Sequence, residues 1–384
     1  MIWLLLFGLL WLTGTGLVLI RNTFEFAGLR NVHPAKQDSG SSISICIPAR
    51  NEENSIEHCV RSVATQTCSQ VEILVLDDQS SDQTSYILNR LQQEFNSITI
   101  LQGKPKPNDW LGKPWACHQL SERANGEYLL FIDADVWLEP DTLRSSLEAM
   151  QEWDMITVWP QQVMHTFWEH AIIPRIYFAL WTLLPARYVE RAPRWMPASL
   201  RTTFSSTFAA ACGQFIMFRK QAYHAIGGHE SVKQDVVEDV QLAKKIKAQQ
   251  FRLKMYHGSG QVYCRMYNSL PEIWNGLRKN FFLGFDQNVV LFLFMAIVHG
   301  ITFLLPFAGI GAGFVSNSFP LILLSINNLA LILLQHVLIY RVFNWRLMHA
   351  LLFPLGVLWY QALGIQCLWD YVSGNKPTWK GRTV

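Results

Sequence analysis

Charged residues are scarce in this chain, and its cysteines form no recognisable pattern. Only 16% of the 384 residues are charged, half are hydrophobic, and the net charge is +3. No long basic stripe interleaves with aromatic residues, so no nucleic-acid partner is predicted. The seven cysteines include no CxxC pair and no metal-ligand spacing, and their odd number argues against a disulfide framework. We therefore expect any chemistry to take place in a reducing compartment, the cytoplasm.

Apolar sequence is what the chain has in excess. With 15 tryptophans and 23 phenylalanines, it is too apolar for one soluble domain and long enough for a domain plus a membrane part. The uncharged run from Ile2 to Ile20 can cross a bilayer once and lacks the basic start and cleavage site of a signal peptide. We expect an N-terminal anchor over 1–21. Three further apolar stretches close the chain, at 289–315, 319–340 and 347–369.

Arginines beside these stretches predict the orientation in the membrane. Arg21, Arg30, Arg341 and Arg346 belong inside by the positive-inside tendency, which places the N-terminus outside and the large central domain in the cytoplasm. Three closing spans would put the basic tail, 373–384, outside, against the same tendency. One closing stretch is therefore expected to be re-entrant or bent at a proline, with the topology left open by charge alone. The prediction is a multi-pass protein of the cell membrane.

Between the membrane stretches, strand-like and helix-like runs alternate. Strands are predicted at 42–47, 71–76, 98–101 and 128–132, helices at 54–66 and 81–95, and a proline-rich loop at 103–114. This order predicts an α/β domain with a mostly parallel sheet, which binds ligands at the carboxyl ends of its strands. Three polar clusters fall at such ends, at 48–52, 77–81 and 133–135.

The third cluster, Asp133-Ala-Asp135, is the most informative. Two carboxylates one residue apart at a strand exit can hold Mg²⁺ or Mn²⁺ against a diphosphate, because these cations prefer hard oxygen ligands. Surface aspartates after a strand are also common in structural roles. Together with the membrane-length stretches, the run points to nucleotide-sugar chemistry beside a membrane.

An ordered set of motifs gives a resemblance. PARNEE (48–53), VLDDQSSDQT (75–84), FIDADVWLEPD (131–141), IGGHE (226–230) and VEDVQLAKKIK (237–247) resemble the family 2 glycosyltransferases with a GT-A fold. The resemblance implies a Rossmann-like GT-A domain over 41–266, an interfacial helix over 267–288 and a transmembrane region over 289–372. DWLGKPWACHQ (109–119) and WKGR (379–382) resemble the membrane-bound branch that acts on carotenoids, hopanoids or related lipids.

The resemblance also implies residue roles. The donor nucleotide would be contacted by Pro48, Ala49, Arg50, Glu52, Asp77, Asp78 and Lys113. Asp135 would be the direct metal ligand, and Asp133 the partner of the ribose or of metal-bound water. Structural alternatives stay open, since Asp77 and Asp78 precede a helix that they can cap, and Lys113 can be an exposed loop lysine.

Glu238 and Asp239 begin a predicted helix, where acidic residues are also stabilised by the helix dipole. The resemblance implies that Asp239 is the general base for an inverting displacement, a role worth about 10²–10⁴-fold in rate. The Gln-x-x-Arg-Trp motif of processive members is missing, so polymer synthesis is not expected. Arg265 and Arg278 are candidates for the diphosphate contact, or for contact with lipid headgroups.

Three functions are compatible with these features. The first is metal-dependent transfer of a hexose, expected to be glucose from UDP-glucose, to a hydroxyl of a membrane lipid such as a carotenoid or another isoprenoid. The second is transfer to a polyprenyl phosphate, which needs no strong base. The third is a non-catalytic membrane protein that binds a nucleotide sugar or a lipid. The aromatic stretch 153–208 either admits a lipid acceptor from the bilayer or packs as an ordinary insertion.

Overall fold

The computed structural model describes residues 1–33, 40–68, 70–193, 195–197, 199–201, 206–285, 287–375, 378–379 and 382–383. Two compact units emerge from the contacts within the chain. Unit 1 comprises Met1–Glu25, Met164–Pro185 and Tyr267–Val384, and unit 2 comprises Phe26–Val163 and Ala186–Met266. The predicted catalytic range 41–266 therefore spans both units. Its apolar and aromatic segment 164–185 belongs to unit 1, where α7 contacts α1 and α6 contacts α16.

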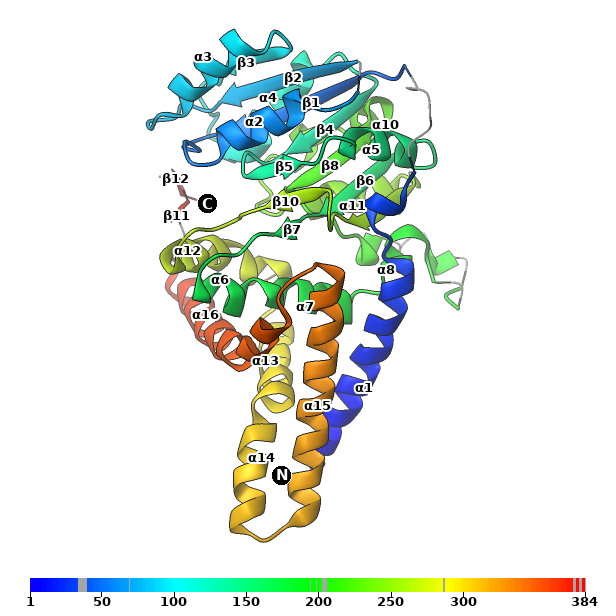
Figure 1. The fold of residues 1–384 in the computed structure, drawn as a ribbon, viewed down its shortest axis with the longest axis vertical. Helices are drawn as coiled ribbons and strands as arrows, with labels where there is room; N and C mark the ends of the chain where they lie inside the picture. Colours follow the sequence, from blue (N-terminus) through cyan, green and yellow to red (C-terminus); the bar gives the residue numbers. More distant parts are fainter. Residues whose placement is uncertain are drawn as a thin grey trace. The chain divides into compact units, whose positions relative to one another are not determined.

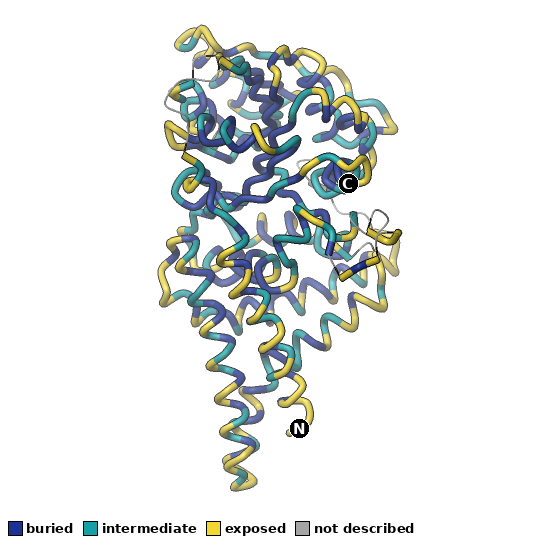
Figure 2. The backbone as a smooth tube through the Cα atoms, turned by 90° about the vertical axis from the view of Figure 1, so that its right-hand side faces the viewer, coloured by how far each residue is buried: buried dark blue, intermediate teal, exposed yellow. Residues whose placement is uncertain are grey.

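Unit 2 is built on a seven-stranded sheet in the order β3-β2-β1-β4-β8-β6-β9. The strands are β1 (Ile43–Ala49), β2 (Val71–Asp77), β3 (Ile98–Gln102), β4 (Tyr128–Ile132), β6 (Met155–Trp159), β8 (Phe215–Arg219) and β9 (Leu253–His257). Only β8 runs antiparallel to its neighbours in this order. The predicted α/β class with a mostly parallel sheet is confirmed. Its strands are the dark, buried segments of this unit in Figure 2.

Helices cover the sheet and create the core of unit 2 (Figure 1). They are α2 (Ile56–Ala64), α3 (Thr84–Glu94), α4 (Gly112–Arg123), α5 (Thr142–Met150), α8 (Ala186–Glu190), α10 (Lys220–Ala225) and α11 (Glu238–Ala248). A small second sheet pairs β5 (Val136–Leu138), β10 (Val262–Cys264) and β7 (Gln161–Gln162). Short 3-10 turns are η1 (Leu29–Asn31), η2 (Ser206–Phe208) and η3 (Gly228–Val232). The central strands are apolar on both faces, as expected when helices cover both sides of a parallel sheet.

Unit 1 is helical apart from a two-stranded end. Its elements are α1 (Ile2–Glu25), α6 (Phe167–Ile172), α7 (Pro174–Leu183), α12 (Leu270–Phe281), η4 (Leu283–Phe285), α13 (Val289–Phe303), α14 (Leu305–Val315), α15 (Phe319–Val342), η5 (Leu347–Leu352), α16 (Phe353–Ser373), β11 (Thr378–Trp379) and β12 (Arg382–Thr383). Three helical stretches, 2–25, 319–342 and 347–373, are long and apolar enough to cross a membrane, and one bent pair would make a fourth. The predicted span 289–315 is broken at Leu304, just before Pro306, a residue that cannot donate a helix hydrogen bond.

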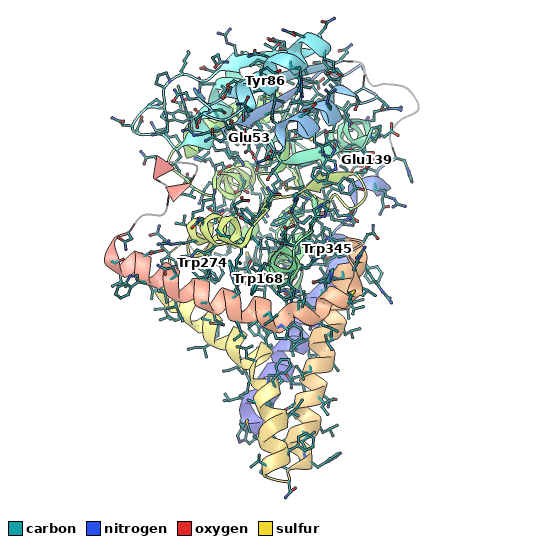
Figure 3. The ribbon with its side chains drawn as sticks, turned by 60° about the vertical axis from the view of Figure 1, so that its left-hand side comes forward. Glu53, Tyr86, Glu139, Trp168, Trp274 and Trp345 are labelled. Atoms are coloured by element: carbon teal, nitrogen blue, oxygen red, sulfur yellow. The ribbon has the colours of Figure 1, made fainter. Side chains whose placement is uncertain are left out.

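Side-chain amides join α1 to α15 within unit 1. Asn328 Nδ2 donates to the carbonyl of Leu5 at 3.2 Å, and Gln335 Nε2 donates to the carbonyl of Leu12 at 2.7 Å. Both donors and both acceptors are seven residues apart, which is two helical turns. The two helices lie side by side in Figure 1, and Figure 3 shows α16 at a steep angle to α15.

Candidate active site

Hydrogen bonds join the carboxyl ends of β1 and β2. Ala49 pairs with Asp77 in the parallel ladder, and the N–H of Asp78 donates to the carbonyl of Ala49 at 2.8 Å. Arg50 Nη1 donates to the carbonyls of Asp78 at 2.5 Å and Gln79 at 3.2 Å. Arg50 therefore holds the first two polar clusters together. The predicted convergence of these clusters at one sheet edge is observed.

The acidic side chains of this edge have structural partners. Asp77 is 1% exposed; one of its oxygens accepts from the N–H of Ser80 at 2.9 Å and the other accepts from the hydroxyl of Ser85. The N–H of Glu52 donates to Thr84 Oγ1 at 2.8 Å, and the Glu52 carboxylate accepts from Ser55 at 3.1 Å. These bonds shape the loops that follow β1 and β2, and the nucleoside contacts predicted for them stay predictions.

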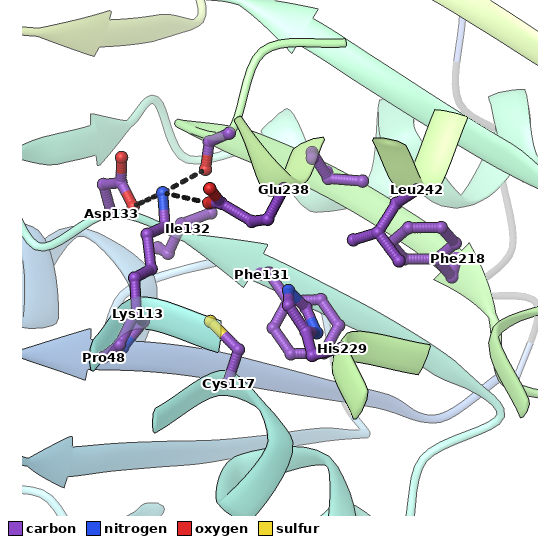
Figure 4. Close-up of a pocket in the computed structure, with 12 residues that line it drawn as sticks. Pro48, Lys113, Cys117, Phe131, Ile132, Asp133, Phe218, His229, Glu238 and Leu242 are labelled. Atoms are coloured by element: carbon purple, nitrogen blue, oxygen red, sulfur yellow. Dashed lines mark hydrogen bonds and ion pairs between the residues drawn. The ribbon is translucent and has the colours of Figure 1, made fainter. Parts of the chain in front are cut away.

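A lysine joins the third cluster to α11 (Figure 4). Lys113 Nζ lies 2.6 Å from Asp133 Oδ1 and 3.2 Å from Glu238 Oε1, and it donates to the carbonyl of Gly213 at 3.4 Å. We call these four residues the Lys113 cluster. Burial opposes the positive charge, but Asp133 and Glu238 outweigh it and hold the pKa of Lys113 well above its usual value. Lys113 lies in the first turn of α4 and is paired with two carboxylates, and its contact with a donor diphosphate stays a prediction.

Asp239 is oriented by backbone amides. Its Oδ2 accepts from the N–H of Gly213 at 2.7 Å and its Oδ1 from the N–H of Val240 at 2.8 Å. Burial and then the charge of Glu238 raise the pKa of Asp239 to about 6, while Lys113 and the two N–H groups act in the opposite direction. A carboxylate with a raised pKa, held at the start of a helix beside a cleft, is suited to accept a proton.

The Lys113 cluster forms the polar side of a small pocket. Its remaining wall is mostly apolar and is formed by Pro48, Cys117, Phe131, Ile132, Ile216, Phe218, His229 and Leu242. His229 is buried, and its Nδ1 is 2.8 Å from the hydroxyl of Tyr223. Burial and then the charge of Lys113 lower the pKa of His229 to about 3, so the ring is neutral and its role here is packing.

Asp133 and Asp135 occupy a tight turn between β4 and β5. The carbonyl of Asp133 accepts from the N–H of Val136 at 3.1 Å, which closes the turn. Asp135 lies beside Cys264 of β10; burial, followed by the charges of Asp135 and Asp133, raises the pKa of that thiol well above its usual value. Within the described residues no three His, Cys, Asp or Glu side chains gather as a metal site. Two carboxylates fit a hard cation that takes its other ligands from a diphosphate and water.

Neither of the two candidate arginines is among the residues that line the pocket. Arg265 directly follows β10 in unit 2. Arg278, on α12 of unit 1, makes a bidentate pair with Asp370 of α16, with both distances at 2.5 Å. This pair fixes α12 to α16. The predicted diphosphate contacts of Arg265 and Arg278 stay predictions.

Gly213 is the site residue that the sequence analysis missed. Its N–H binds Asp239 and its carbonyl binds Lys113, and a Cβ at this position would lie 3.0 Å from Lys113 Nζ and 3.2 Å from Asp239 Oδ2. The signal available in the sequence was a glycine two residues before the apolar run that begins at Phe215. A glycine there marks a place where other groups approach the backbone closely.

This sheet, with carboxylates at its strand exits and on α11, is the GT-A fold of glycosyltransferases. Residues 44–227 match the model of the family described as "Glycosyl transferase family 2". Together with the relatives described below, this match identifies the chain as a glycosyltransferase.

Similar proteins agree with this class. A 4,4'-diaponeurosporenoate glycosyltransferase of Staphylococcus haemolyticus strain JCSC1435 is 24% identical over 278 residues, covering 71% of this chain and 70% of the relative. The protein of the same name from Staphylococcus aureus strain USA300 is 27% identical over 243 residues, which is 61% of this chain and 60% of the relative's length. A mannosyltransferase of Pyrobaculum calidifontis, PcManGT, solved with GDP-Man and Mn²⁺, shares the fold with a TM-score of 0.55 at 16% identity, over 96% of this chain and 99% of that one.

Proposed function

We propose that the chain transfers a hexose from a nucleotide-diphosphate sugar to a hydroxyl of a carotenoid-like isoprenoid lipid, with UDP-glucose as the expected donor. One observation carries the proposal. A candidate metal carboxylate, Asp133, and a cation, Lys113, line one pocket, and Asp239, a carboxylate of raised pKa, is bound to Gly213 in the wall of that pocket. A sugar transferase needs a group that balances the leaving diphosphate and a group that accepts the proton of the attacking oxygen.

The candidate site residues divide between charge balance at the diphosphate and proton transfer. Asp133 and Asp135 would hold a divalent cation, which neutralises charge on the diphosphate. Lys113 adds a second positive charge at the same end, and its ion pair with Asp133 must loosen or be shared when the donor binds. Asp239 takes the proton of the acceptor hydroxyl, and the Gly213 N–H keeps the carboxylate turned toward its place of reaction. Direct displacement by that oxygen would invert the anomeric centre.

The predicted membrane topology also has a structural explanation in unit 1. If α1, the α13–α14 segment and α15 each cross the bilayer while α16 lies along its surface, the basic tail stays on the same side as Arg341. This satisfies the positive-inside tendency that three closing spans would violate. Trp168, Trp274 and Trp345 gather at the end of unit 1 opposite the α14–α15 turn (Figure 3), where a membrane interface accommodates their rings.

An acidic acceptor is the second candidate. The Staphylococcus relatives are named after a carboxylate, 4,4'-diaponeurosporenoate. A carboxylate or a polyprenyl phosphate is already an anion, so its transfer would depend only weakly on Asp239.

Sugar transfer into membrane lipids tests the proposal. Membranes that contain the full chain or its Asp239→Asn variant receive a panel of radiolabelled UDP- and GDP-sugars, with and without EDTA. We expect one labelled lipid that requires both Asp239 and a divalent cation, and its mass identifies the acceptor. Label that persists in Asp239→Asn would favour the acidic acceptor. No label above background with any donor, in membranes supplied with carotenoid alcohols and acids, would contradict the transferase assignment and favour a binding protein.

A further inference from the structure

Helix α7 of unit 1 carries a buried arginine. Arg175 is 7% exposed, and its Nη1 makes a hydrogen bond to Nε2 of His336 on α15. The other ring nitrogen, Nδ1 of His336, lies 2.7 Å from the carbonyl of Ile332, which can only accept. His336 therefore donates through Nδ1 and accepts through Nε2, so the imidazole is neutral. The guanidinium faces a neutral ring on this side.

Two neighbouring helices supply further neutral groups. Gly356 of α16 leaves room for the arginine stem, because a Cβ at this position would lie 3.1 Å from Arg175 Cγ. Tyr360 is one turn further along the same face of α16 and interacts electrostatically with Arg175, as does Tyr340 of α15. Contacts of α7 with both α15 and α16 confirm that the three helices meet here.

Several buried hydrogen-bond donors around Arg175 lack an acceptor. Among the described residues, Nε and Nη2 of Arg175 and the hydroxyl of Tyr360 are buried without a hydrogen-bond partner. The described carboxylates of unit 1 bind elsewhere: Glu25 to Arg21, Glu169 to Thr166, Glu272 to Asn268 and Asp370 to Arg278. A guanidinium has five N–H donors and no acceptor; Tyr340 makes a side-chain hydrogen bond to Arg175, and an acceptor from outside can satisfy the donors that remain. A water molecule would supply hydrogen bonds but would leave the buried charge unbalanced.

We propose that Arg175 and Tyr360 form a binding site for the anionic head of a membrane lipid, a carboxylate or a phosphate. A guanidinium binds two oxygens of such a group through parallel N–H donors. The surroundings favour a lipid over a free ion, because the site is lined by the rings of Phe178, which stacks on His336, and of Phe303 and Phe353, which contact these two. The site also lies one turn before Arg341 at the end of α15, where a bilayer would meet water.

This site is built from unit 1 alone, and it is independent of the transfer reaction proposed above. An ionisable group inside a membrane region commonly marks a ligand or an ion path, and here the missing partner is an anion. A binding assay without any sugar donor reads this site directly, so its failure and the failure of the proposed function are distinguishable.

Retention of lipid by the purified full chain tests the inference. The protein in a neutral detergent is titrated with oleate or dioleoylphosphatidylglycerol and examined by native mass spectrometry. Oleyl alcohol tests the same chain without a charge, and acetate and inorganic phosphate test the same charge without a chain. We expect oleate, phosphatidylglycerol or both to bind, the alcohol and the free ions to bind at least tenfold more weakly, and Arg175→Gln to weaken lipid binding about tenfold.

Three further variants keep the test decisive if Arg175→Gln does not fold. Arg175→Lys keeps the charge but loses the planar fork, and Tyr360→Phe removes one hydroxyl, so each is expected to weaken lipid binding by roughly threefold. Arg341→Gln changes an exposed arginine at the end of α15 and is expected to bind lipid like the wild type. Equal binding of oleyl alcohol, equal binding of the free ions, or wild-type lipid binding by the variants of Arg175 and Tyr360 would each overturn the inference.

Discussion

The two units balance buried positive charge in opposite ways. In unit 2, the Lys113 ammonium lies within 2.6 Å and 3.2 Å of carboxylates that the protein itself provides. In unit 1, Arg175 is bound to a neutral histidine, and the described carboxylates of that unit pair elsewhere. A cation that already has acidic partners must exchange them when a ligand arrives, whereas a cation without them favours an anion supplied from outside.

The difference suggests how each unit recognises its ligand. In the Lys113 cluster the ammonium is already paired with carboxylates, so the proposed donor diphosphate and its cation would have to redistribute these ion pairs on binding. Around Arg175, buried hydrogen-bond donors lack acceptors in apolar surroundings, and the proposed anionic lipid head would supply those acceptors. The predictions below separate these two kinds of site, beginning with the largest expected effect.

Replacing the candidate base Asp239 is expected to have the largest effect on the site in unit 2. Asp239→Asn is expected to lower the rate constant of sugar transfer by about 10²–10⁴-fold, because an amide cannot take the proton of the acceptor hydroxyl. Single-turnover transfer from a radiolabelled donor measures the loss. Asp235→Asn, in the loop just before α11 and outside the residues that line the pocket, is the matched control. A variant Asp239→Asn with wild-type rates would show that the acceptor arrives as an anion.

The pH dependence of transfer reports the same carboxylate. With the pKa of Asp239 raised to about 6, kcat/KM is expected to fall about tenfold per pH unit below pH 6. The same shift affects folding: a raised pKa favours the folded state in its protonated form, so this contribution to stability is complete below pH 3.8 and is lost as the pH rises through about 6. An acid limb near pH 4 would contradict the raised pKa.

Removing the positive charge of Lys113 is expected to have a smaller effect. Lys113→Met is expected to raise the KM for the donor by roughly tenfold; the effect is limited because the side chains of Lys113 and Asp133 are 36% and 28% exposed. Because Lys113 lowers the pKa of Asp239, its loss shifts the acid limb of kcat/KM to higher pH. Lys113→Arg keeps the charge and should restore most of the affinity, and Lys104→Met in the exposed loop before α4 is the control. An unchanged KM in Lys113→Met would remove Lys113 from donor binding.

The sequence predicted the local features of the fold and of the site well. The apolar runs at 42–47 and 128–132 mark strands because a central strand is buried on both faces, and the polar clusters mark their ends. The resemblance assigned both Lys113 and Asp133 to the donor site, and in the structure these two side chains form an ion pair.

Contacts over long sequence separations were not predictable. Gly213 and Lys113 are 100 residues apart, and no local pattern states that the Gly213 peptide would connect a lysine to a base. Arg175 lay unnoticed in a stretch of aromatic residues, where a snorkelling arginine is the ordinary expectation. Its partner His336 is 161 residues away, so only the packing of α7 against α15 reveals that its charge is buried.

The pair Arg278–Asp370 tests whether a sequence-predicted donor contact is instead an anchor of unit 1. Arg278→Gln and Asp370→Asn are each expected to lower the free energy of unfolding by about 2 kcal/mol, since each breaks a bidentate charged hydrogen bond. Thermal unfolding in detergent measures the loss, and the KM for the donor is expected to stay at the wild-type value in both. A raised KM in Arg278→Gln but not in Asp370→Asn would place Arg278 at the diphosphate after all.

The hydrogen bonds from Asn328 and Gln335 of α15 to carbonyls of α1, the amide ladder, test how unit 1 satisfies its buried polar groups. The expected effect is the smallest of the series. Asn328→Leu is expected to lower the stability of unit 1 by about 1 kcal/mol, because it removes the donor to the Leu5 carbonyl. The adjacent Asn327 is exposed, so Asn327→Leu makes the same chemical change without losing that bond and serves as the control. Equal melting temperatures for the two variants would contradict the ladder. A lower melting temperature in Asn328→Leu alone would show that unit 1 pairs its neutral polar groups internally. The charge of Arg175 would then differ from these groups in needing a partner from outside the protein.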